Sequence, residues 1–240
     1  MNRIWSLCLL FWGSIALSQP GQLFFGNGLI QQVVPAPDGN YFLLGSSGGA
    51  NSMVKLLKIN PVGDVVWEKS YISGANSYGH GLTQLADGSL LIAGQSGAVA
   101  LLIKTDAEGN ELWKRTYANT TALFDVAPSG NQLLLAGWQD NTGTSDSGLL
   151  MLVNSNGILQ WRKPIDVRSQ TYAKRIFPTA DGNFLLLGRA NDIGAGFKGI
   201  FIRKIDPAGN LIWQKTYDTG FEERDYNMPV SGEFFSEPLG

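Results

Sequence analysis

The chain has 240 residues, 18 of them basic and 20 acidic, so its formal net charge is −2. Because the charge is balanced and no basic stripe is present, nucleic acid is not an expected partner. Charged residues are few (16%), whereas glycine (30) and tryptophan (7) are plentiful. This profile indicates a turn-rich β-protein and excludes a disordered chain.

Residues 1–18 predict a secretory signal peptide. A short basic start precedes the apolar stretch 4–17, which is too short to span a membrane, and small residues lead to an expected cleavage between Ser18 and Gln19. Cys8, the only cysteine, lies inside this peptide, so no disulfide or cysteine metal site is expected in the mature chain. No later segment is apolar for long enough to form a transmembrane helix. We therefore expect a protein that is secreted, held at the cell surface or retained in the periplasm.

A turn with aspartate and glycine recurs along the chain and predicts the first hairpin of each repeat. It occurs as Asp38-Gly39, Asp87-Gly88 and Asp181-Gly182, and Ser129-Gly130 stands in the corresponding place of the third copy. Each is followed by an apolar run that ends in glycine. Asp-Gly between apolar runs is a strong hairpin signal, and a continuous apolar run is typical of a strand that is covered on both faces.

A second hairpin recurs four times, over residues 59–71, 105–117, 153–165 and 205–217. Asp or Asn opens each turn and glycine closes it, which is the chemistry of a type I turn followed by a left-handed glycine. The turn glycines are Gly63, Gly109, Gly157 and Gly209. Four residues later come Trp67, Trp113, Trp161 and Trp213, at steps of 46, 48 and 52 residues.

Four strands in each repeat of 40 to 50 residues predict the blade of a β-propeller. We expect an all-β fold in which residues 19–218 form four-stranded antiparallel blades over about 22–71, 72–118, 119–166 and 167–218. Residues 219–240 are expected to be an incomplete fifth blade or a tail. A partial or truncated ring is the first expectation, and a closed four-bladed ring is the second. The third is an open arc that self-associates through an exposed sheet face.

The repeated tryptophans have two interpretations. Trp67, Lys69 and Tyr71 alternate along one strand and share a face, as do their equivalents in the second and fourth repeats, whereas Ile165 replaces the tyrosine in the third. One interpretation is a ladder of aromatic and cationic groups that binds sugars or anions. The other is packing, in which each indole fills the gap between neighbouring sheets. Identical side chains in every repeat favour packing.

The stretches 181–188 and 199–217 resemble repeats of secreted β-propeller proteins of bacteria, in particular Bacteroidetes-like surface proteins. The resemblance covers about residues 22–218 and implies a secreted or cell-surface propeller. The spacing Asp106-x-x-Gly109-x-x-x-Trp113 is also similar to quinoprotein blades. In those proteins the motif joins neighbouring blades, and the vicinal cysteine pair of their quinone site has no counterpart in the mature chain.

Candidate chemistry is sparse in the sequence. His80 is the only histidine, which excludes a site of several histidines, and we expect it in the loop that enters the second blade. Asp140 and Asp146 belong to an oxygen-rich stretch that offers calcium ligands, although it lacks the spacing of an EF-hand. We predict no catalytic residue and no cofactor.

Two functional hypotheses arise from this pattern. The first is a secreted, non-enzymatic module that binds a protein or glycan partner, or has a structural role, at the cell surface. The alternative is an extracellular carbohydrate-active enzyme or sensor framed by the propeller. Polar residues that occur in one blade only and converge on the axis would favour the alternative, and repeated apolar residues there would exclude it.

Overall fold

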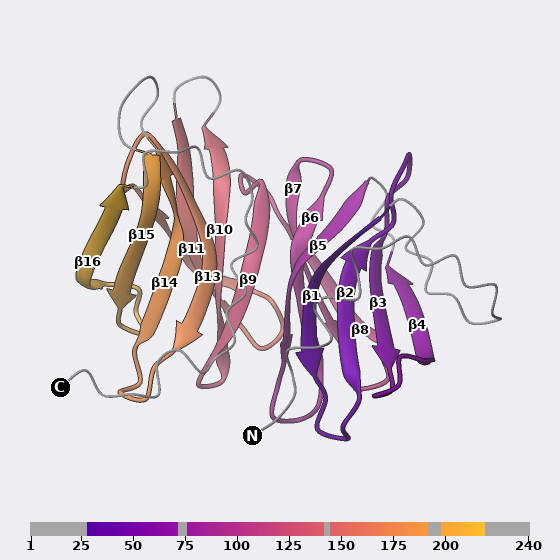
Figure 1. The fold of residues 1–240 in the computed structure, drawn as a ribbon. Helices are drawn as coiled ribbons and strands as arrows, with labels where there is room; N and C mark the ends of the chain where they lie inside the picture. The colour runs from indigo at the N-terminus through magenta and orange to yellow at the C-terminus, as the bar shows by residue number, and fades with distance from the viewer. Residues whose placement is uncertain (1–27, 72–75, 142–144, 192–197, 219–240) are drawn as a thin grey trace.

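The computed structural model describes residues 28–71, 76–141, 145–191 and 198–218. The predicted signal peptide and residues 219–240 lie outside these ranges. The described residues form sixteen strands in successive groups of four, and Figure 1 shows these groups fanned along an arc. They include no helix with the length and apolar character that crossing a membrane requires.

The predicted fold class is confirmed, because each group is a four-stranded antiparallel blade whose strands pair in chain order. Blade 1 comprises β1 (Leu29–Pro35), β2 (Tyr41–Ser46), β3 (Val54–Ile59) and β4 (Val65–Tyr71), and blade 2 comprises β5 (Ser77–Gln84), β6 (Leu90–Ser96), β7 (Val99–Thr105) and β8 (Glu111–Tyr117). Blade 3 comprises β9 (Ala122–Ser129), β10 (Gln132–Asn141), β11 (Ser145–Asn154) and β12 (Leu159–Ile165), and blade 4 comprises β13 (Gln170–Pro178), β14 (Phe184–Asn191), β15 (Lys198–Ile205) and β16 (Leu211–Asp218). One parallel pair, Asp146 with Gln170, links β11 of blade 3 to β13 of blade 4.

The core lies between consecutive blades, and the second strands of blades 2 and 3 contribute to it on both faces. On β6, Leu90 and Ile92 pack into a cluster shared with blade 1, whereas Leu91 and Ala93 pack into a cluster shared with blade 3. All four side chains are fully buried. The continuous apolar run in the sequence therefore reflects a strand between two neighbouring blades, as predicted.

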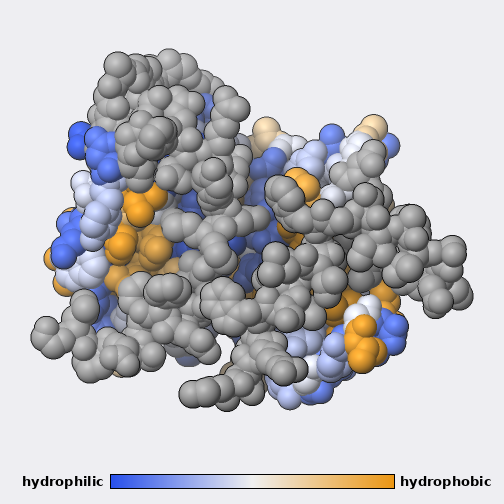
Figure 2. Space-filling model, viewed as in Figure 1, coloured by the Kyte–Doolittle hydropathy of each residue, from blue (hydrophilic) through white to orange (hydrophobic). Residues whose placement is uncertain are grey.

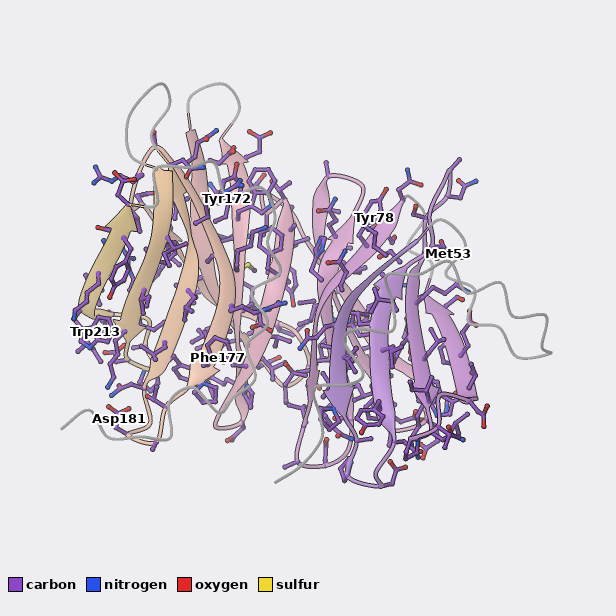
Figure 3. All side chains as sticks on the ribbon, in the orientation of Figure 1. Met53, Tyr78, Tyr172, Phe177, Asp181 and Trp213 are labelled. Carbon is purple, nitrogen blue, oxygen red and sulfur yellow. The ribbon has the colours of Figure 1, made fainter. Side chains whose placement is uncertain are left out.

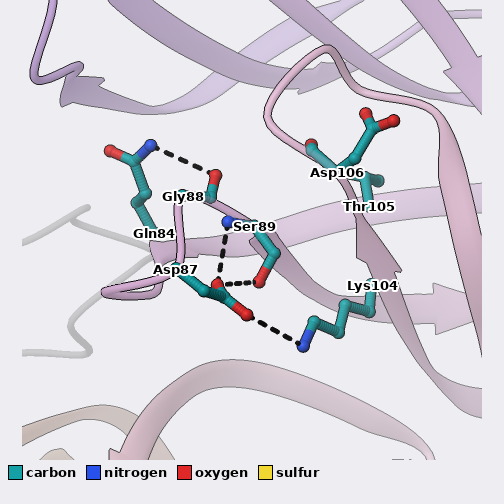
Figure 4. Close-up of polar contacts among 7 residues, drawn as sticks. All are labelled: Gln84, Asp87, Gly88, Ser89, Lys104, Thr105 and Asp106. Atoms are coloured by element: carbon teal, nitrogen blue, oxygen red, sulfur yellow. Dashed lines mark hydrogen bonds and ion pairs between the residues drawn. The ribbon is translucent and has the colours of Figure 1, made fainter.

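The first hairpin of each blade turns as the Asp-Gly pattern predicts, and blade 2 shows how (Figure 4). Gly88 has a φ of +83°, and the Asp87 carboxylate accepts hydrogen bonds from the Ser89 amide (3.0 Å) and the Ser89 hydroxyl. Lys104 on β7 lies 3.6 Å from the same carboxylate. These hydrogen bonds and the lysine hold the pKa of Asp87 below its usual value. Lys58–Asp38 and Lys204–Asp181 are the equivalent ion pairs of blades 1 and 4.

The second hairpin of each blade has the predicted turn and bulge. In blade 2, Asp106 Oδ1 accepts hydrogen bonds from the amides of Glu108 (3.0 Å) and Asn110 (2.7 Å). Gly109 has a φ of +76°, in the left-handed region that glycine adopts without strain. The register then shifts between Lys104 and Thr105, which places one extra residue in the outer strand.

The described blades form an open arc. Blade 4 lies at the left end of Figure 1 and blade 1 at the right end. Three large buried clusters join blade 1 to blade 2, blade 2 to blade 3 and blade 3 to blade 4. Within the described ranges, blade 4 does not pack its strands on blade 1, so these residues do not form the closed four-bladed ring that the sequence left open.

Candidate functional site

The first junction between blades joins the outer strand of blade 1 to the second turn of blade 2. The indole edge of Trp67 lies so close to Gly109 that a Cβ there would come within 2.9 Å of it. The Tyr71 hydroxyl donates a 2.7 Å hydrogen bond to the Gly109 carbonyl, and Lys69 Nζ donates a 3.0 Å bond to Asn110 Oδ1. The three alternate residues of β4 therefore all contact one turn.

The second junction repeats this arrangement. A Cβ on Gly157 would lie 2.9 Å from the Trp113 ring, and the Tyr117 hydroxyl donates a 2.9 Å hydrogen bond to the Gly157 carbonyl. The Arg115 guanidinium lies over the Trp113 ring, 5.6 Å from its centroid. Burial raises the pKa of the Tyr117 hydroxyl well above its usual value, which keeps it protonated as the donor.

The third junction keeps the indole contact and loses the hydroxyl. A Cβ on Gly209 would lie 2.6 Å from the Trp161 ring, and Lys163 Nζ donates hydrogen bonds to the Ala208 carbonyl (2.7 Å) and Asn210 Oδ1 (3.0 Å). Ile165 is buried where the first two junctions have tyrosine. In these three junctions the edge of each indole rests on the backbone of the next blade.

Trp213 differs from the expectation that all four tryptophans lie between sheets. It is 40% exposed and Tyr217 is 46% exposed, because they lie on the outer strand of the last described blade and no further described turn covers them. The same sequence motif thus has two settings in the structure. The presence or absence of a neighbouring blade against the outer strand decides the setting.

The inner strands of the four blades share a feature that the sequence analysis missed. Each carries a β-bulge, seen as a register shift against the second strand at an equivalent position. The extra residues at the four bulges are Gln31, His80, Phe124 and Lys174. They differ from blade to blade, unlike the outer-strand residues, and bulges commonly re-aim side chains next to functional sites.

The glycine that ends each apolar run was the sequence signal for these bulges. A Cβ on Gly94 would lie 2.1 Å from the Tyr78 carbonyl, on Gly137 2.2 Å from the Ala122 carbonyl, and on Gly188 2.1 Å from the Tyr172 carbonyl. The inner strand approaches the second strand too closely there for any side chain. Glycine inside a strand often marks such a bulge.

Aromatic and cationic side chains gather on the inner strands of blades 2 to 4 and on the second strands beside them. The His80 and Phe124 rings have centroids 5.3 Å apart, and Lys174 Nζ lies 3.5 Å from the centre of the Phe124 ring. The Tyr172 ring is flanked by the Arg189 guanidinium at 4.6 Å and by the Trp138 ring at 5.2 Å. We call these residues the inner-strand cluster: His80, Phe124, Trp138, Tyr172, Lys174 and Arg189.

His80 was expected in a loop, and that expectation is wrong. The residue lies within β5, half-buried, with its Nε2 3.4 Å from Gln95 Oε1. Tyr78 and Tyr172 are labelled in the upper half of Figure 3, whereas Asp181 lies at the opposite end of the blades. The cluster therefore belongs to the end of the propeller where the inner strands begin.

One of the two predicted calcium ligands contributes to this cluster. The Asp146 carboxylate accepts a hydrogen bond from the Tyr172 hydroxyl, and burial together with Asp146 raises the pKa of Tyr172 to about 12. Asp140 is exposed and is the cross-strand neighbour of Asp146. Residues 142–144 between these strands lie outside the described ranges. Among the described residues, no three His, Cys, Asp or Glu side chains gather in a group that would hold a metal ion.

Asp125 is a buried carboxylate that the sequence analysis also missed. It follows the Phe124 bulge and accepts hydrogen bonds from the amides of Ile176 (3.0 Å) and Val126 (2.9 Å). Burial raises its pKa to about 6, and the charge of Arg175 opposes this shift. An acidic residue inside the apolar segment 122–127 was the available signal.

Asp125 joins blade 3 to blade 4, and other polar side chains join the preceding inner strands. Gln32 exchanges two hydrogen bonds with the backbone of Leu82, at 2.8 and 3.1 Å. Thr83 donates a 2.6 Å bond to the Val126 carbonyl. Each junction thus has at least one polar side chain that joins the inner strands, as well as an indole at the outer strand.

A shallow pocket of about 430 Å³ lies at the opposite end of blades 3 and 4, among the residues of the first turns. Its lining includes Pro128, Gln132, Pro178, Asn183 and Phe184. No ionisable side chain belongs to the described residues that line it. The pocket therefore lacks groups for acid–base chemistry, and the inner-strand cluster is the stronger candidate site.

Comparison with known proteins finds similar solved structures. No family model and no curated protein sequence matches the chain. A protein of unknown function from Dyadobacter fermentans is similar with a TM-score of 0.58 and 12% identity, over 80% of this chain and 68% of that chain. The WD40 domain of Neurospora crassa Pan2 is similar with a TM-score of 0.55 and 10% identity, over 78% of this chain and 50% of that chain.

The fold is a β-propeller. At identities this low the likeness shows the fold alone, and a propeller carries many unrelated functions. The chain spans half the length of the Pan2 domain that it matches.

Proposed function

We propose that this propeller is a secreted, non-enzymatic binding module of the cell surface, of the kind found in the Bacteroidetes-like proteins whose repeats it resembles. The observation that carries the proposal is the difference between outer and inner positions. Outer-strand residues repeat and join the blades, whereas the four bulge residues of the inner strands are all different. Residues that serve packing repeat with the blades, so non-repeated residues at equivalent bulges indicate a ligand site.

The chemistry of the inner-strand cluster favours an acidic glycan as the ligand. Phe124, Tyr172 and Trp138 offer ring faces, which suit the apolar faces of sugars. Lys174 and Arg189 lie against these rings and supply positive charge for a carboxylate or sulfate group. The Asp146 carboxylate is engaged by the Tyr172 hydroxyl.

Binding is tested with the mature chain on a glycan array, followed by calorimetric titration of the glycans retained. Lys174→Ala should weaken binding by ~10-fold or more, the scale of a charged hydrogen bond. Lys114→Ala, on an outer strand, is the matched control and should leave the affinity unchanged. Retention of no glycan, or equal losses in the two variants, would contradict the proposal, and retention of acidic peptides alone would replace the glycan by a protein ligand.

The non-enzymatic part of the proposal is supported by the engagement of the carboxylates near the cluster. Asp125 accepts hydrogen bonds from two backbone amides and Asp146 accepts one from Tyr172. The secreted part is supported by residues 1–18 of the sequence, and N-terminal sequencing of the exported protein should read from Gln19.

The non-repeated bulge residues are also compatible with the alternative, a carbohydrate-active enzyme or sensor, and one further observation favours it. Asp125 has a pKa raised to about 6, which suits a general acid, and a Cβ on Gly81, next to His80, would lie 3.2 Å from its Oδ1. Hydrolysis of any glycan that the array retains, lost in Asp125→Asn while the fold persists, would establish catalysis. Unchanged glycan after prolonged incubation would support the binding module.

A further inference from the structure

The junctions between blades have a direction. In all three, the outer strand of one blade supplies the tryptophan, and the next blade along the chain supplies the turn glycine. Each contact thus has two halves, an outer strand with its tryptophan and a turn with its glycine. An arc built in this way leaves one half without its counterpart at each end. Among the described residues, blade 4 ends with an outer strand that has no turn against it, and the second turn of blade 1, between β3 and β4, is covered by no outer strand.

The unused half on blade 4 is an exposed aromatic and cationic surface. Every residue of β16 is exposed, including the large side chains Trp213 (40%) and Tyr217 (46%). In Figure 2 this end of the arc carries hydrophobic and hydrophilic residues side by side. We call Trp213, Lys215 and Tyr217 the blade 4 face.

The unused half on blade 1 is the turn of residues 60–64, called here the blade 1 turn. Gly63 has a φ of +95°, the left-handed conformation shared by Gly109, Gly157 and Gly209. No described atom lies within 4 Å of the place where its Cβ would be, and Val62 is 81% exposed. The turn therefore has the shape that the other three junctions use, and it is open to receive an indole.

The two halves are also matched in charge. In two of the internal junctions the lysine of the outer strand, Lys69 or Lys163, donates a hydrogen bond to the asparagine after the turn glycine. In the blade 1 turn the residue after the glycine is Asp64. A lysine that meets this turn would form an ion pair in place of a neutral hydrogen bond, and Lys215 is the corresponding lysine of the blade 4 face.

We propose that the blade 4 face binds the blade 1 turn of a second copy of this chain. Trp213 would rest on Gly63 of the partner, Tyr217 would donate to its carbonyl, and Lys215 would pair with Asp64. Among the described residues, the blade 1 turn of the same chain lies at the far end of the arc from the blade 4 face (Figure 1). Two such contacts around a twofold axis would close a ring of eight blades, which is within the usual range.

The mass of the mature chain in solution, measured by light scattering over a range of concentrations, gives the first test. We expect a concentration-dependent dimer, and Trp213→Ala should weaken it by ~10-fold or more, as for a tryptophan at the centre of an interface. Leu112→Ala, an exposed side chain of an outer strand inside the arc, is the control and should leave the dimer intact. A monomer at all concentrations would overturn the proposal, as would a dimer unaffected by Trp213→Ala.

A charge exchange separates contacts between copies from contacts within one chain. Asp64→Lys and Lys215→Asp should each weaken the dimer by roughly 2- to 5-fold per contact. An equimolar mixture of the two variants should dimerise again, because at each contact the charges at positions 64 and 215 are then opposite. If the mixture does not dimerise, and the Asp64→Lys/Lys215→Asp double variant restores the contact while it stays a monomer, the two halves meet within one chain. That result would overturn the proposal.

Discussion

The hydroxyl of Tyr71 in blade 1 donates a 2.7 Å hydrogen bond to the carbonyl of Gly109 in blade 2. Both residues are buried, and burial raises the pKa of the tyrosine well above its usual value. The two bonded residues lie 38 positions apart in the chain and belong to different blades. It fixes the turn of blade 2 against the outer strand of blade 1, next to the contact of Trp67.

Tyr71→Phe should destabilise the protein by about 1–2 kcal/mol, because it leaves the buried Gly109 carbonyl without its partner. Urea unfolding monitored by tryptophan fluorescence measures the change. Tyr217→Phe removes the equivalent hydroxyl on the exposed face of blade 4 and should cost less than ~0.5 kcal/mol in the monomer. Equal losses would mean that the junction does not depend on this hydrogen bond.

Gly109→Ala and Gly182→Ala form a matched pair. The two glycines have φ values of +76° and +79°, so alanine suffers the same backbone strain at both, about 1–2 kcal/mol. At Gly109 the new methyl group would also meet the Trp67 ring at 2.9 Å, whereas at Gly182 no described atom lies within 4 Å. We expect Gly109→Ala to cost a further ~1–3 kcal/mol in thermal or urea unfolding. If the two variants lose the same unfolding free energy, the turn of blade 2 is not in close contact with the Trp67 indole.

Asp125 should make the protein less stable as the pH rises. An ordinary aspartate in an ion pair has the opposite effect. Burial raises its folded pKa to about 6, above the usual unfolded value of ~3.9, so the folded state binds the proton more tightly. The resulting stabilisation is fully present below about pH 4 and is lost as the pH rises through 6. Relative to Asp125→Asn, the wild type should lose about 2 kcal/mol of unfolding free energy between pH 4 and pH 7.

The exposed Asp140→Asn is the control for the loss of one charge, measured over the same pH range. A flat difference between wild type and Asp125→Asn from pH 4 to pH 7 would mean that Asp125 keeps an ordinary pKa in the folded protein.

The features that could be predicted from the sequence are those that one hairpin determines by itself. The turn around Asp106 and Gly109 needs only its own side chain and a positive φ, so its residues identify it wherever it recurs. The buried second strand was likewise predictable, because its continuous apolar run is typical of a strand that is covered on both faces.

The features that could not be predicted depend on strands that are distant in the sequence. The bulge at His80 exists because β5 approaches β6 at a glycine, and its contact with Phe124 depends on the next blade. Asp125 is stabilised by the amide of Ile176, 51 residues away. The exposure of Trp213 depends on the spatial neighbours of blade 4, which the repeated motif does not encode.

The account depends most directly on the claim that an indole joins each blade to the next. Unfolding free energies of Trp67→Ala, Trp113→Ala, Trp161→Ala and Trp213→Ala, measured below the concentration of self-association, test it. We predict losses of about 3 kcal/mol for the first three, the low end of the scale for a large buried aromatic because these indoles are half-buried, and less than ~1 kcal/mol for Trp213→Ala. Equal losses at all four positions, or a loss below ~1 kcal/mol for Trp113→Ala, would contradict the account.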